Sequence, residues 1–141
     1  MFDMKVQDRL RAWFDFRNKL ENDDNPFQST LELYNKAPIT SFRIDPYTPD
    51  TYPDPWELLD ENLYDDFGYI LGIGYTLRLT DRFSQVPMKI TITQDNKRSC
   101  NHYLLHIQDK VIGFDREKII DENELPKSLF IESIYEIPCD Y

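Results

Sequence analysis

The two histidines are the first residues whose spacing could serve chemistry. His102 and His106 lie four positions apart, which on a helix would place two zinc ligands on one face. Tyr103, Leu105 and Ile107 alternate through the same stretch and predict a strand instead. Four strand residues separate the imidazoles by roughly 13 Å, which is too far for one metal ion. We therefore expect ordinary strand histidines.

Acidic residues offer two further constellations. Asp54, Asp95 and Lys97 superficially match a nuclease pattern that holds Mg²⁺ beside a phosphate. Asp54, however, precedes Pro55 and lies three residues before Glu57, as a helix cap does, and Lys97 falls in a turn. A second group could bind Ca²⁺ or Mg²⁺, although the sequence has no Asp-x-Asp-x-Asp-Gly loop. Its members are Asp60, Glu61, Asp65 and Asp66.

The glycines and the candidate nucleophiles predict neither a phosphate-binding loop nor a catalytic site. Gly72 and Gly74 are not followed by the Gly-Lys-Ser/Thr of a phosphate loop. No Ser, Cys or Thr stands in a recognisable nucleophile setting. The sequence thus predicts no catalytic residue, no cofactor and no metal. The alternative, a hydrolase or transferase, would need His102, His106 and Asp65 to converge in a pocket.

The first 37 residues are expected to form a helical hairpin. In residues 4–22 apolar side chains recur at helical spacing, and Asp3 is placed to cap the start. The apolar positions are Val6, Leu10, Trp13, Phe14 and Leu20. Asn25 and Pro26 begin a second helix, as N-cap and first helical residue. Five prolines lie between positions 38 and 55. They predict that residues 38–56 form an extended arm, which wraps the domain or reaches a neighbour.

The remaining residues, 57–141, predict an α+β core. A short helix follows the Asp54 cap, and residues 65–79 fit either a helix or a strand. We favour the helix, because Asp65 and Asp66 would then lie in its first turn, where the helix dipole stabilises acidic residues. The glycines of this helix would be explained if another backbone packs closely against it. From Pro87 the period becomes two, which predicts antiparallel strands. The predicted strands cover 88–93, 103–107 and 111–114, and 118–120 and 129–137 are further candidates. We expect all these elements to form one domain of residues 1–141.

Charge and cysteine usage limit the partners. The 141 residues carry a net charge of −10, and residues 44–77 hold eight acidic residues and no basic one. Such a charge repels nucleic acid and anionic membranes and favours a basic partner or divalent cations. Cys100 and Cys139 have no metal-type spacing, so we expect a reducing compartment. No apolar run is long enough for a membrane helix, and the N-terminus is not a signal peptide.

Five segments of the chain carry a likeness to known sequences: 17–21, 24–27, 45–47, 52–59 and 71–80. Through them the sequence from Arg17 onward resembles a family of uncharacterised proteins of large contractile-tailed marine phages. It implies a phage product in the virion or the bacterial cytoplasm and carries no biochemical activity. The layout of 65–115 is also similar to the papain/transglutaminase-like fold. That similarity implies a His at His102 and a Cys at the helix start, where this chain has Asp65 and Asp66.

These observations predict a non-enzymatic structural or interaction protein of the phage neck, tail or baseplate. Its partners would be phage or host proteins, or further copies of the chain. The candidate interaction residues are Tyr47, Tyr52, Trp56, Asp60, Glu61, Asp65 and Asp66. The alternative is an early phage protein that inhibits a basic host or defence factor, or a papain-like relative without its nucleophile.

Overall fold

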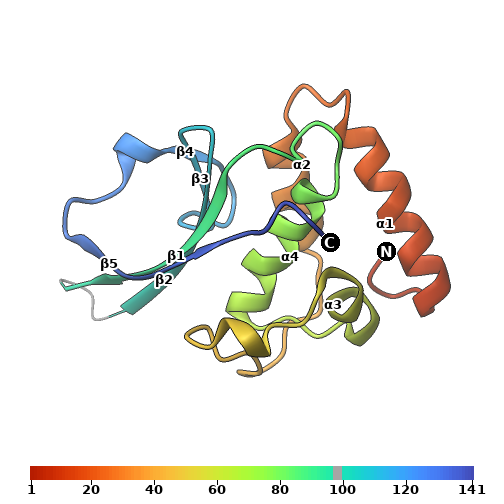
Figure 1. The fold of residues 1–141 in the computed structure, drawn as a ribbon, viewed down its shortest axis with the longest axis horizontal. Coiled ribbons are helices and arrows are strands. Elements are labelled where there is room, and N and C mark those ends of the chain that lie inside the picture. Colours follow the sequence, from red (N-terminus) through yellow and green to blue (C-terminus); the bar gives the residue numbers. More distant parts are fainter. Residues whose placement is uncertain (97–99) are drawn as a thin grey trace.

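In a computed structural model, α-helices precede an antiparallel sheet (Figure 1). The structure describes residues 1–96 and 100–141. The α-helices are α1 (Val6–Leu20), α2 (Pro26–Tyr34), α3 (Pro55–Glu61) and α4 (Asp66–Arg78), and short 3-10 helices span Pro49–Thr51 and Glu122–Glu124. The first 3-10 helix and the start of α3 interrupt the segment 38–56, which was predicted to be extended throughout. The strands are β1 (Met88–Asp95), β2 (Cys100–Ile107), β3 (Lys110–Ile112), β4 (Ile120–Asp121) and β5 (Leu129–Glu136). The α+β class expected from the sequence is confirmed. Lys97, which was predicted to fall in a turn, lies outside the described residues.

Helix α4 lies between the sheet and the other helices (Figure 1). All its residues from Phe67 to Arg78 are buried. A helix that is covered on every side has no polar face, which is why its sequence shows no clear helical period. The choice of helix over strand for 65–79 is confirmed.

Two glycines let neighbouring side chains approach α4. A Cβ on Gly72 would lie 2.5 Å from Cε1 of Tyr34, and a Cβ on Gly74 would meet Cδ1 of Ile137. The expectation that another backbone packs at these positions is wrong. A tyrosine ring and an isoleucine methyl group fill the space instead.

A single hydroxyl joins α1 and α2 to α4. Trp13 Nε1 donates to Thr76 Oγ1 at 2.9 Å, and the Tyr34 hydroxyl lies 3.0 Å from the same oxygen. All three residues are buried, and burial raises the pKa of Tyr34 to about 12. The phenol therefore stays protonated and can take part in this network throughout the physiological pH range.

The start and the buried face of α1 differ from the prediction. Lys5, not Asp3, occupies the N-cap position, and its side chain makes no capping bond. Phe14 is exposed, whereas Arg9 is buried because its guanidinium donates to the carbonyls of Met4, Leu59 and Asp60. The period of apolar residues cannot reveal a buried arginine that donates to two carbonyls of another helix, α3.

The sheet has the order β4-β3-β2-β1-β5 and every pairing is antiparallel. Its inner face, which includes Ile90 and Leu105, belongs to the core around α4. Its outer face carries Leu104, which packs with Val111 and Ile120 beneath the segment that leads to β5. Strands β4 and β5 are the two edges of this sheet, and the register of β5 shifts opposite Ile92 and Thr93.

Candidate functional site

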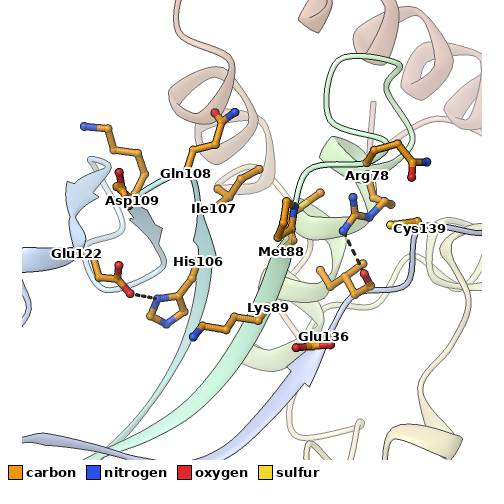
Figure 2. A pocket seen from close by; sticks show the side chains of 14 residues that line it. Arg78, Met88, Lys89, His106, Ile107, Gln108, Asp109, Glu122, Glu136 and Cys139 are labelled. Carbon is orange, nitrogen blue, oxygen red and sulfur yellow. Dashed lines mark hydrogen bonds and ion pairs between the residues drawn. The ribbon is translucent and has the colours of Figure 1, made fainter.

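A hollow of about 500 Å³ opens at the end of the sheet where β1 begins and β2 and β5 end. Figure 2 shows its lining side chains, which come from the end of α4, the strand ends and the turn after β2. Apolar Met88 and Ile107 lie between His106 on one side and Arg78 with Cys139 on the other. The hollow has the size of a small-molecule site.

His106 is held between a hydroxyl and a carboxylate. Its Nε2 lies 2.8 Å from Thr91 Oγ1, and its Nδ1 lies 3.3 Å from Glu122 Oε1. Burial lowers the pKa of His106, and the Glu122 carboxylate offsets part of this effect. The imidazole is thus neutral at pH 7. If Thr91 donates to Nε2, the ring proton lies on Nδ1 and is donated to Glu122.

Hydroxyl, imidazole and carboxylate in this order resemble the relay of a nucleophilic enzyme. The Thr91 side chain, however, belongs to a fully buried residue in the middle of β1 and does not line the hollow. A nucleophile must reach its substrate, and Thr91 Oγ1 is covered. The arrangement fixes the ring of His106 at the edge of the hollow and gives no exposed nucleophile.

The pKa of His106 predicts a pH dependence of stability. Because the folded-state pKa lies below that of the unfolded chain, the unfolded chain takes up the proton first as the pH falls. The His106 contribution is therefore fully present above about pH 6.5 and declines below it. In urea unfolding between pH 7.5 and 5.0, His106→Gln should lose less stability than the wild type does. His102→Gln controls for the loss of an imidazole, and equal slopes for wild type and His106→Gln would contradict the assignment.

The structure confirms that His102 and His106 lie on one strand, β2. The ring of His102 packs against Phe114, with centroids 5.1 Å apart, and His102 lines a hollow of about 230 Å³ together with Asp66 of α4. The papain-like layout requires a Cys at this helix start, where the chain has Asp65 and Asp66. Tyr103, the next residue, points to the opposite face, where its ring centroid lies 5.4 Å from that of Phe67. His102, His106 and Asp65 do not converge, since no hollow described here is lined by more than one of them.

The acidic candidates occupy different environments. Asp60 and Glu61 are exposed at the end of α3, and Glu61 pairs with Arg43 at 2.6 Å. Asp66 is exposed and pairs with Arg116 at 2.9 Å. The segment 44–77 has no base of its own, but the fold brings Arg43 and Arg116 to its carboxylates. Local sequence therefore overstates the negative charge of this surface.

Asp65, in contrast, is buried beneath the arm. Its Oδ1 accepts from the amide of Gly68 at 2.6 Å and so caps α4. Its Oδ2 accepts from the amides of Arg43 and Ile44 at 2.9 and 2.8 Å. One carboxylate thus joins the start of α4 to the arm, and it is not available to a partner.

The aromatic residues of the arm also differ in their exposure and contacts. Tyr47 is exposed, and its hydroxyl donates to Glu132 of β5 at 2.8 Å. Tyr52 is half-buried, with its ring 4.9 Å from those of both Phe67 and Tyr135. Trp56 is 43% exposed at the start of α3, whose predicted capping box between Asp54 and Glu57 is confirmed. The arm therefore lies against the domain between α4 and β5.

Two exposed residues were missed as candidates. Ile39 is 80% exposed and Phe42 is 72% exposed. They line a hollow of about 310 Å³ together with Asp65, Phe67 and Tyr103. Burial and the nearby charges of Asp65 and Asp66 raise the pKa of Tyr103. The sequence did contain a signal for these two residues. Bulky apolar residues in a segment that starts at Pro38 have no helix or strand in which to be buried.

The remaining observations concern metal sites, membrane-spanning helices and known protein families. Over the described residues, no group of three or more His, Cys, Asp or Glu side chains is arranged to hold a metal ion. In the same part of the chain, no helix has the length and apolar character needed to cross a membrane. The chain matches no protein-family model, and a search of curated proteins finds no relative.

Proposed function

We propose that the protein is a non-enzymatic interaction protein of a phage particle, a component of the neck, tail or baseplate. The proposed contact surface, named here the 39–47 surface, consists of Ile39, Phe42 and Tyr47. The observation that supports it is the exposure of Ile39 and Phe42 beside a hollow. Exposed apolar side chains that lie together mark interaction sites, whereas single exposed apolar residues are common on protein surfaces. The phage setting rests on the sequence resemblance.

Purified particles provide the test of this surface. We expect Ile39→Ser/Phe42→Ser to reduce the amount of protein bound to particles by about 30-fold, because anchor residues at the centre of an interface contribute about 2 kcal/mol. Quantitative mass spectrometry of particles from complemented infections measures the bound amount. The melting temperature should change little, since neither side chain is buried.

Phe14→Ser is the matched control, because Phe14 is 53% exposed on α1 and lies outside the 39–47 surface. It should leave particle binding unchanged. Wild-type protein that is absent from purified particles would refute the particle assignment. Wild-type protein that is present, together with full binding of the double variant, would refute the 39–47 surface alone.

The alternative, an inhibitor that uses its acidic residues to bind a basic host factor, has less support. Asp65 is buried, and Glu61 and Asp66 already pair with arginines. Of the four acidic candidates, Asp60 has an exposed side chain and no ion pair among the described residues.

A further inference from the structure

Cys100 and His102 lie two residues apart on β2, so their side chains leave the strand on the same face. The Sγ atom of Cys100 lies 3.5 Å from Nε2 of His102, a hydrogen-bonding distance for sulfur. Two strand residues are separated by about 6.6 Å along the chain, so the two side chains must lean toward each other to meet. The contact therefore places a thiol beside a side-chain base.

The imidazole of His102 is held in this position by its surroundings. Its ring packs against that of Phe114, with centroids 5.1 Å apart. Its backbone carbonyl accepts from Oγ1 of Thr93, its partner in β1, at 3.2 Å. The strand pairing fixes the backbone and the Phe114 ring restricts the imidazole, so Nε2 faces the sulfur of Cys100 without rearrangement.

Both groups of this pair are within reach of solvent. Cys100 is half-buried, and His102 is half-buried at the edge of the 230 Å³ hollow. In this respect the pair differs from Thr91 and His106, where the hydroxyl is fully covered. Asp95 lies opposite Cys100 in β1, and its carboxylate opposes negative charge on the sulfur. An imidazolium beside the sulfur would offset that repulsion.

We propose that Cys100 is a site of thiol–disulfide exchange with low-molecular-weight disulfides, and that His102 is the base that accepts the thiol proton. A thiolate is the form of cysteine that attacks a disulfide, and an imidazole is a base that exchanges its proton near neutral pH.

The exchange step uses only the reagent and these two side chains. The proton moves from Sγ to Nε2, and the sulfur attacks one sulfur of the disulfide. The new S–S bond forms as that of the reagent breaks, and the leaving thiolate takes the proton from Nε2. The products are a mixed disulfide on Cys100 and one free thiol, so the reagent is the oxidant and is itself reduced. The site lies outside the 39–47 surface and does not depend on the proposed function.

The two cysteines of the intact wild-type chain provide the first test. Cys139 is exposed, and within residues 1–96 and 100–141 no hydrogen bond joins it to a histidine. The probe is the neutral bis(2-hydroxyethyl) disulfide at pH 7, and acid quenching with peptide mass spectrometry gives the rate of mixed-disulfide formation at each cysteine. Exposure alone would make Cys139 the faster residue. We expect Cys100 to react faster, and the opposite order would overturn the proposal.

His102→Gln tests the role of the imidazole. At pH 7 it should slow the reaction of Cys100 by at least about tenfold, because a positioned base is lost, and leave Cys139 unchanged. Near pH 9.5 the difference should fall below about twofold, because hydroxide ionises thiols there without a neighbouring base. His106→Gln removes an imidazole from the same strand and should leave both rates unchanged.

A purely structural effect of His102→Gln on the exposure of Cys100 would change its rate by the same factor at both pH values. That result would overturn the assignment of His102 as the base, as would an unchanged Cys100 rate at pH 7. If His102→Gln does not fold, the comparison of Cys100 with Cys139 in the wild type still decides the proposal.

Discussion

Asp65→Ala should lower the free energy of unfolding by about 4 kcal/mol, the largest effect we expect from a single polar substitution. Loss of the cap on α4 accounts for about 1 kcal/mol. The amides of Arg43 and Ile44 would each lose their acceptor, at about 1.5 kcal/mol for each. For a chain of this size the melting temperature should fall by about 10 °C. Urea unfolding and calorimetry measure both quantities.

Asp66→Ala is the matched control for this substitution. Asp66 is adjacent in sequence and equally charged, but it is exposed and pairs with Arg116 at the surface. Its loss should cost less than about 1 kcal/mol. Equal stability of the two variants would show that the Asp65 carboxylate does not join the arm to α4. A binding experiment that neutralises both residues together would therefore confuse unfolding with loss of a partner.

Gly72→Ala should destabilise the protein by about 3 kcal/mol, although alanine is the better helix former by about 1 kcal/mol. The new Cβ would lie 2.5 Å from the ring of Tyr34. That ring cannot move aside, because Tyr34 is fully packed and its hydroxyl is bonded to Thr76. The measurement is the free energy of unfolding in urea.

Two comparisons make the Gly72 prediction specific. Gly74→Ala should cost less, because the new Cβ meets Cδ1 of Ile137, the end of a side chain that can rotate. In a double-mutant cycle, Tyr34→Leu should relieve part of the Gly72→Ala cost, with a coupling of at least about 1 kcal/mol. Additive free energies in that cycle would contradict the proposed clash with the Tyr34 ring.

The apolar pattern predicted most of the elements but less of their packing. Ile90 and Ile92 alternate with polar residues, and strand β1 confirms the pattern. For α1 the same reasoning assigned Phe14 to the core and missed Arg9, because two of the three carbonyls that Arg9 contacts lie about 50 residues away in sequence. Periodicity predicts the average burial of a helix face. A long-range hydrogen bond can make the burial of a single residue the opposite of that prediction.

Of the candidate site, the sequence identified residue types but not their surroundings. The predicted interaction residues include Asp65, which is buried, and Tyr47, which is exposed. They do not include Ile39 and Phe42. The pairing of His106 with Thr91 and Glu122 was also missed, because it joins three separate strands and turns. No spacing rule within one segment could have revealed it.

Local sequence was sufficient to predict the capping box of α3, the strand alternation and the order of helices before sheet. These features depend on backbone hydrogen bonds and side chains within a few residues of one another, so local sequence specifies them. The packing of distant segments determines which carboxylates are covered and which aromatic residues remain exposed, and it places Arg78 at the border of a hollow. Those outcomes depend on burial between segments far apart in the chain, and no local pattern encodes which distant backbone a side chain will meet.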